Sequence, residues 1–212
     1  MALERNVRVR CALGAVALAL AASGPAHGKP AEPRKAAGLG GYFLIAAPEM
    51  GDPRFSRTVV YLMHHDASGA LGLIVNRPFE EVPIALLLDR LGQPHEGVSG
   101  SLQVHYGGPV DSGRVFVLHT TDYRADGTHV IADGIAVSAP SGVLRAIGAG
   151  AGPRRALLAL GYSGWAAGQL EGEIRAGGWI AVPAEAALLF DEHDETKWQR
   201  AMARRKHEGI DL

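Results

Sequence analysis

Short apolar segments separated by glycine-containing turns are the feature that most constrains how this chain folds. The segments at 129–132 and 135–139 are joined by an Asp-Gly dipeptide, and those at 57–65 and 71–76 are joined by the turn sequence DASGA. Asp-Gly between two such segments is a strong signal for a two-residue hairpin. Many residues of these segments are apolar, β-branched or aromatic, as in strands. We therefore expect antiparallel hairpins in the first two thirds of the chain.

Four helices are expected among these strands. The helix at 82–92 is predicted because four apolar side chains recur at helical spacing on one face, and Ser141 is expected to cap the helix that follows it. The order of elements predicts an α+β fold, a hairpin-rich mixed sheet flanked by about four helices. The remaining helices are expected at 141–150, 166–178 and 194–209, and the remaining strands at 42–47, 102–106, 114–120, 154–162 and 179–184.

The N-terminal residues differ from the rest of the chain in composition. A basic stretch at 5–10 precedes an apolar run at 11–22, and small residues follow. This order is typical of a secretory signal peptide, and the run is shorter than the roughly 20 residues that span a bilayer. We expect 1–26 to be a signal-like leader, 27–41 a flexible linker and 42–212 a single domain. A misplaced start codon or a disordered extension is the alternative for the leader.

Cysteine content and charge exclude several classes of function. The one cysteine, Cys11, lies in the leader, so the domain itself offers no disulfide, catalytic thiolate or cysteine-type zinc site. The formal net charge of −1 lacks the basic balance of proteins that neutralise phosphates. The sequence contains no second long apolar stretch, so we expect no membrane span in the mature protein. If the leader is cleaved, the protein is exported or periplasmic.

The stretch at 157–174 predicts a strand, a tight turn and a helix, with Ser163 at the bend. A nucleophile elbow requires Gly-x-Ser-x-Gly, so that the strained turn passes close to strand and helix. Gly161 fits this motif, but Trp165 stands where the second glycine belongs. We therefore expect no catalytic serine. Ser163 or Gly164 would instead end the strand and cap the helix, while Trp165 packs.

Metal, phosphate and nucleic-acid sites are not expected either. His64 and His65 are adjacent on a predicted strand and therefore point to opposite faces, and the other strand histidines stand alone. No glycine-rich loop follows a strand and opens a helix, as a phosphate loop does. The basic cluster at 204–207 is explained by the dipole of the helix that it ends. We expect no metal and no cofactor.

Three turns with polar or aromatic neighbours, at 76–78, 107–109 and 161–165, are the remaining candidates for a binding site. If they converge, they form a ligand cleft that presents one guanidinium and one indole. The alternative is that the glycines tighten turns and that the indole fills the core. The candidate ligand-binding residues are Asn76, Arg77, Gly107, Gly108, Ser163 and Trp165.

Five stretches of the sequence, in this order, resemble the YqgE/AlgH family of bacterial proteins. The resemblance implies a small, barrel-like, branched sheet flanked by helices. It implies no established enzyme activity, cofactor or catalytic residue, and it implies a cytoplasmic location, from which the leader departs. Some members are described as transcriptional regulators linked to alginate production. The stretches are FSRTVVYL (55–62), GALGLIVNRP (69–78), YGGPV (106–110), GYSGWAAGQLEGEI (161–174) and GGWIAVPA (177–184).

These observations together predict a non-enzymatic domain that binds a small molecule or a partner protein through the turns named above. A transcriptional regulator is the first alternative, as the family name suggests, although no residue pattern here supports nucleic-acid binding. A serine hydrolase using Ser163 is the second. The identity of the partner and the oligomeric state stay open.

Overall fold

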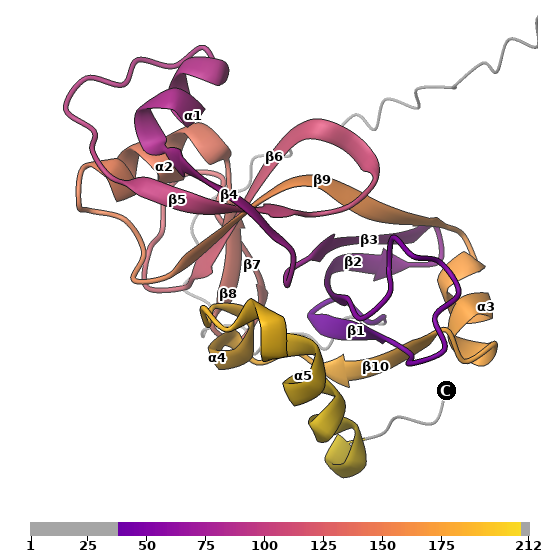
Figure 1. The fold of residues 1–212 in the computed structure, drawn as a ribbon. Helices are drawn as coiled ribbons and strands as arrows, with labels where there is room; N and C mark the ends of the chain where they lie inside the picture. Colours follow the sequence, from indigo (N-terminus) through magenta and orange to yellow (C-terminus); the bar gives the residue numbers. More distant parts are fainter. Residues whose placement is uncertain (1–37, 209–212) are drawn as a thin grey trace, which may run out of the picture. The chain divides into compact units, whose positions relative to one another are not determined.

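The computed structural model of this chain describes residues 38–208 (Figure 1). The expected leader, 1–26, and most of the expected linker lie outside the described residues. Within these bounds no helix is both long and apolar enough to cross a membrane. The strands are β1 Tyr42–Ala46, β2 Val59–Asp66, β3 Gly69–Ile74, β4 Pro78–Pro83, β5 Ser101–Tyr106, β6 Val110–Thr120, β7 His129–Ala132, β8 Ile135–Ser138, β9 Ala156–Ala166 and β10 Trp179–Pro183. The helices are α1 Ile84–Arg90, α2 Pro140–Gly148, α3 Gln169–Arg175, α4 Ala186–Leu189 and α5 Asp194–Glu208.

The strands form one branched and curled sheet, which confirms the predicted α+β class. Eight strands follow the path β10-β1-β2-β3-β9-β6-β8-β7, while β4 pairs with β5, and β5 joins β9. All of these pairs are antiparallel except β5 with β9. Two of the expected hairpins are present, as β2–β3 and β7–β8. The consecutive strands β5 and β6 do not form a hairpin, because each pairs with β9 instead. The curl makes the sheet a half-barrel, as the family resemblance implied.

Three apolar clusters fill the spaces between the sheet and the helices. The largest packs strand residues such as Phe43 and Tyr61 against Leu189 and Phe190, which belong to the α4 region. A second covers the other face of β1–β3 beneath α3, and a third packs β5, β6 and β9 against α1 and α2. In Figure 1, α1 and α2 lie together at one end of the molecule and α3 lies at the other.

The prediction of a bend at Ser163 is wrong. Strand β9 continues through this residue to Ala166, because Ser163 pairs with Gly72 in β3 and the pairing extends to Gly69. The chain turns only after the strand ends. Gly168 adopts a left-handed conformation there, with φ of 74°, and begins α3. Neither Ser163 nor Gly164 therefore caps a helix, whereas Trp165 is buried as expected.

Two further expectations about helix starts are corrected. Helix α2 begins at Pro140 with no side-chain cap, so Ser141 lies inside it; proline is favoured at the first helical position, because its missing N–H would have no partner within the helix. Helix α1 begins at Ile84, and the residues before it form β4. The sequence PFEEVP was missed as a strand because it is polar and has a proline at each end, which is typical of an edge strand.

The end of the expected linker already belongs to the domain. Leu39 is buried, and its backbone N–H donates a hydrogen bond to Nδ1 of His65 at 2.9 Å. A Cβ atom on Gly38 would overlap the carbonyl oxygen of His65. The packed domain therefore includes residues 38–41, which the composition alone assigned to the linker.

Candidate functional site

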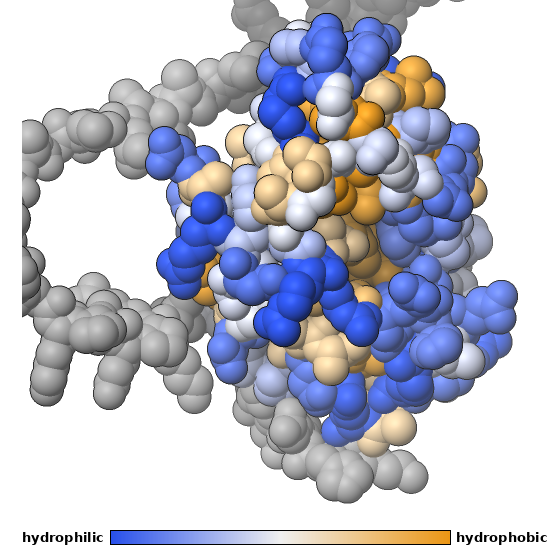
Figure 2. Space-filling view, turned by 90° about the vertical axis from the view of Figure 1, so that its left-hand side faces the viewer, coloured by the Kyte–Doolittle hydropathy of each residue, from blue (hydrophilic) through white to orange (hydrophobic). Residues whose placement is uncertain are grey.

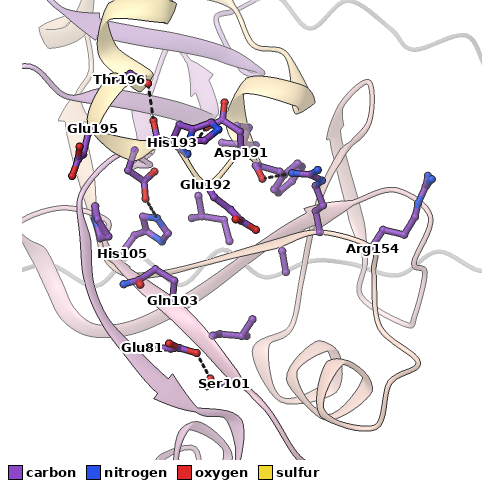
Figure 3. A pocket seen from close by; sticks show the side chains of 18 residues that line it. Glu81, Ser101, Gln103, His105, Arg154, Asp191, Glu192, His193, Glu195 and Thr196 are labelled. Carbon is purple, nitrogen blue, oxygen red and sulfur yellow. Dashed lines mark hydrogen bonds and ion pairs between the residues drawn. The ribbon is translucent and has the colours of Figure 1, made fainter.

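An open groove of about 950 Å³ lies between β5, the start of β9 and the connection from α4 to α5 (Figure 3). Its apolar lining comes from all three segments, with Leu102 on β5, Leu157 on β9 and Phe190 after α4. Ligand sites in proteins typically measure about 300–1,000 Å³ and combine an apolar lining with a few polar groups. The polar lining residues are Glu81, Ser101, Gln103, His105, Arg154, Arg155, Asp191, Glu192, His193, Asp194, Glu195 and Thr196.

One side of the molecule carries a recessed apolar surface (Figure 2). Figure 2 shows the side on which α1 and α2 lie, and apolar residues occupy a recess there between hydrophilic side chains. In the close view, Gln103 and His105 of β5 lie on one side of the groove, and the α4–α5 connection lies opposite (Figure 3). Arg154 lies apart from the other labelled side chains.

A buried network of charged side chains underlies the groove. Nζ of Lys197 is fully buried and lies 2.9 Å from Oδ1 of Asp194. The other carboxylate oxygen, Oδ2, lies 3.1 Å from Nε2 of His105. Lys197 also donates to the backbone carbonyls of Val75, Leu189 and Asp191, at 3.1 to 3.2 Å. The lysine therefore ties β3 and the α4–α5 connection to the first turn of α5.

The ionisation of Asp194 determines which hydrogen bonds this network makes. Burial opposes ionisation of the carboxyl group, but hydrogen bonds from His105 and Lys197 outweigh burial and hold the pKa of Asp194 below its ordinary value. An ionised carboxylate only accepts, so Nε2 of His105 must carry the proton and donate it. The second ring nitrogen, Nδ1, is buried and has no partner among the described residues.

The α4–α5 connection is fixed by charged groups on both of its sides. Asp191 accepts a hydrogen bond from the Arg200 guanidinium at 2.8 Å, and Nη1 of Arg155 donates to the carbonyl of Phe190 at 3.0 Å. Burial by itself would raise the pKa of Asp191. The hydrogen bonds from Arg200 and from the backbone of His193 lower it by more, so the pKa of Asp191 lies below its ordinary value. This wall of the groove is therefore largely preformed.

The predicted binding residues of the first turn make structural contacts. The side chain of Asn76 accepts from the backbone of Val59 at 2.8 Å and donates to the carbonyl of Arg57 at 3.0 Å. The guanidinium of Arg77 donates to the carbonyls of Ser56 and, at 3.4 Å, Pro53. These contacts anchor the loop between β1 and β2.

The other two turns do converge, but their backbones pack directly on one another. A Cβ atom on Gly107 would overlap the carbonyl oxygen of Gly161, and one on Gly108 would overlap the backbone of Tyr162. Ser163 is 1% exposed, and its hydroxyl donates a long hydrogen bond of 3.5 Å to the carbonyl of Gly107. The glycines here permit a close approach of two strands.

Trp165 lies two residues farther along the same strand and holds α3. Its Nε1 donates to Oε2 of Glu173 at 2.9 Å, and Nε1 of Trp179 donates to the same oxygen at 2.8 Å. The two indole rings meet edge to face. Of the six residues proposed from the sequence, none lines the groove described above; that they bind a ligand stays a prediction.

The sequence interpretation missed His105, Asp194 and Lys197 as a group. Each is unremarkable by itself, because a single strand histidine and an acid in the first turn of a helix are common. The only local signal was the spacing of Asp194 and Lys197 by three residues, which places them on one helix face. Their partner His105 is separated from Asp194 by 89 residues, so only the folded chain reveals the contact.

Two further observations concern the predictions that the chain has no metal site and no nucleic-acid site. In residues 38–208, no group of three or more His, Cys, Asp or Glu side chains is arranged to hold a metal ion. Arg204, in the basic cluster at the end of α5, forms an ion pair of 3.0 Å with Glu185. This contact gives the arginine a structural partner within the domain.

Comparisons with known proteins agree with this fold. UPF0301 proteins of Rhodospirillum rubrum and Bradyrhizobium diazoefficiens are each 46% identical to this chain, covering 78% and 82% of it and 86% and 85% of their own lengths. The solution structure of AlgH from Pseudomonas aeruginosa has a TM-score of 0.68 at 39% identity, covering 87% of this chain and 94% of that one. A crystal structure of a Corynebacterium diphtheriae protein, with a TM-score of 0.63 at 21% identity over 78% of this chain and 86% of its own, shares the fold.

The names of these relatives state no activity. The AlgH-like family model matches residues 43–209, nearly all of the domain described above. This match and the two 46% identities confirm the family that the five sequence stretches predicted. The chain belongs to the AlgH-like family, whose function is uncharacterised.

Proposed function

We propose that this protein is a non-enzymatic binding domain and that its ligand, a small molecule or a short segment of a partner, occupies the groove between β5 and the α4–α5 connection. The observation that carries the proposal is the composition of the groove. Apolar side chains from three separate segments converge with polar groups in a volume of about 950 Å³, which is the size and chemistry of ligand sites.

The candidate cleft of the sequence analysis supports the proposal less well. Its glycines are in backbone contact, and its arginine and asparagine are engaged with loop carbonyls and amides. A ligand there would have to displace contacts that hold the sheet together. The groove has the opposite character, because its walls are held from behind by Lys197 and Arg200 while its surface stays open.

Filling the groove tests the proposal. Ala156 is half-buried and lines the groove, so Ala156→Trp should block it, whereas Ala125→Trp places the same indole on an exposed loop outside it. A library of small amines, carboxylates and neutral aromatics is screened against the labelled protein by amide chemical-shift perturbation. We expect shifts at 101–105, 154–157 and 189–196 that Ala156→Trp abolishes and Ala125→Trp preserves.

Two outcomes would contradict the proposal. One is that no member of the library shifts the groove residues. The other is that the shifts gather at 107–109 and 161–165 and persist in Ala156→Trp, which would return the site to the turns. Both variants should keep the amide dispersion of the folded protein, which the same spectra report.

A further inference from the structure

His65, near the end of β2, is bonded to two segments that are far apart in the sequence. Its Nδ1 accepts a hydrogen bond from the backbone N–H of Leu39 at 2.9 Å, and its Nε2 lies 3.1 Å from Oε1 of Glu171 on α3. A backbone N–H can only donate, so Nδ1 carries no proton. The ring proton is therefore on Nε2, which donates it to the carboxylate of Glu171, and the two partners together fix the neutral ring in one tautomer.

The residues that His65 holds, 38–41, form a strap where the chain enters the domain. Leu39 is buried in the apolar cluster that also contains Trp165. The other end of the strap is fixed without a side chain, because the N–H of Gly41 donates to the carbonyl of Leu62 at 2.8 Å and its own carbonyl accepts from Ala184 at 3.1 Å. The imidazole therefore acts on the Leu39 end of the strap.

Protonation of the ring changes its two contacts in opposite ways. An imidazolium has a proton on both nitrogens and can only donate, so Nδ1–H would face the N–H of Leu39 and that hydrogen bond would be lost. The bond from Nε2–H to the carboxylate of Glu171 would become a pair of opposite charges, which is stronger than a neutral hydrogen bond. Imidazole is the side chain that ordinarily changes its charge between about pH 5 and 8.

The other charged groups near the ring are engaged elsewhere or act through Glu171. The strap and β3 contain no titratable side chain. On β2, His64 and Asp66 pair with each other at 3.0 Å in exposed positions. On α3, Glu173 accepts from two indole groups. Arg175 acts on Glu171, whose pKa lies below its ordinary value mainly because of a hydrogen bond from its own backbone and a second from the ring.

A single proton on this ring therefore distinguishes the strap from α3. We propose that His65 is a pH-dependent latch, whose neutral ring holds the strap at Leu39 and whose protonated ring releases Gly38 and Leu39 while it keeps its contact with α3. Titration is an equilibrium, so Nδ1 needs access to water only in the released form. Because residues 1–37 precede the strap, the latch sets how firmly the chain is held where it enters the domain.

The test follows the ring and the strap in one sample of the isotope-labelled full chain. Long-range ring spectra report the proton on each nitrogen of His65, and hydrogen exchange reports the protection of the Leu39 amide, both between about pH 8 and about pH 5. The Leu39 amide shift should move with the same midpoint as the ring. Its protection factor should fall about five- to tenfold, as expected for the loss of one hydrogen bond. The amide of Gly41, bonded to Leu62, should keep its protection.

Matched substitutions of two adjacent histidines locate the effect. His65→Asn places an amide oxygen near the position of Nδ1 but does not titrate, so Leu39 should stay protected at about pH 5. His64→Asn removes a histidine whose side chain is 61% exposed and should leave the transition as in the wild type. Glu171→Gln removes the carboxylate that favours the imidazolium, so the transition should move to lower pH by about half a unit.

Four results would overturn the latch. The first is that the ring of His65 takes up its second proton while the Leu39 amide keeps its shift and its protection, and the second is that the ring stays neutral down to about pH 5. The others are a transition that persists in His65→Asn and one that disappears in His64→Asn. The wild-type comparison needs no variant to fold. The strap, His65 and Glu171 do not line the groove, so failure of the latch and failure of the proposed function are separate results.

Discussion

Two similar side-chain arrangements, one near each end of β9, differ in how completely their polar atoms are paired. At the α3 end, one carboxylate, Glu173, receives both indole N–H groups of Trp165 and Trp179, and Gln169 donates to its other oxygen at 2.9 Å. At the groove end, the carboxylate of Asp194 binds Lys197 and His105. Each carboxylate fastens a helix to the sheet.

The two regions differ in whether a polar atom is left without a hydrogen-bond partner. In the α3 region every indole N–H and both carboxylate oxygens have partners, so the arrangement is complete as a packing contact. In the groove region Nδ1 of His105 remains without a partner beside an open, apolar surface. Buried polar groups are nearly always paired, so this network is less completely satisfied than the one around Glu173.

Removing the buried cation should have the largest effect. Lys197→Met leaves Asp194 with one partner fewer and three backbone carbonyls without their donor, and breaking such a buried pair costs about 3–5 kcal/mol. Urea unfolding followed by tryptophan fluorescence measures the loss. Arg90→Met, at an exposed position of α1, is the control and should change the free energy of unfolding by less than about 0.5 kcal/mol. A similar small change for Lys197→Met would show that the network is not structural.

Removing the Trp165 side chain from the α3 region should lower the free energy of unfolding by a comparable or slightly smaller amount. Trp165 is 7% exposed, so Trp165→Ala should destabilise the fold by about 3–5 kcal/mol through the cavity that it leaves. It should not alter ligand binding in the groove. Trp165→Phe keeps most of the packing but not the bond to Glu173, and should cost about 1 kcal/mol more than the loss of ring size alone. A cost near zero for Trp165→Ala would instead indicate an exposed ligand platform.

The smallest expected effect is the dependence of the free energy of unfolding on acidic pH. Because the pKa of Asp194 is lowered in the fold by its bonds to His105 and Lys197, despite burial, its stabilising contribution is present above the ordinary pKa of 3.8 and is lost as pH falls through the lower, folded value. The free energy of unfolding should therefore fall with pH below about 4. Asp194→Asn should reduce that slope, whereas Glu96→Gln, at an exposed site, should keep it. Equal slopes in wild type and Asp194→Asn would contradict the assignment.

Much of the architecture could be predicted from local sequence patterns. The hairpins at β2–β3 and β7–β8 follow from turn sequences between apolar segments, and the helical face of α1 follows from its periodicity. The errors have physical causes. Strand β4 is a polar edge strand, and β9 is longer than its apolar core because β3 continues to pair with it beyond Ser163.

The candidate site was far less predictable. The glycine-rich turns attracted attention because glycine permits unusual backbone geometry, and the structure uses that freedom for close strand contacts. The groove instead depends on contacts between residues far apart in the chain, such as His105 with Asp194 and Lys197 with Val75. None of these residues belongs to a recognisable short motif.

The sequence by itself determined the class of fold, the hairpin order and the family, because turn chemistry, strand alternation and helix periodicity act over a few neighbouring residues. Only the tertiary structure decided where the chain leaves a polar atom without a partner and an apolar surface open. Those properties depend on the curled sheet, which brings β5 and the first turn of α5 together across 89 residues of sequence. Burial and pairing are properties of the packed molecule, and no local pattern contains them.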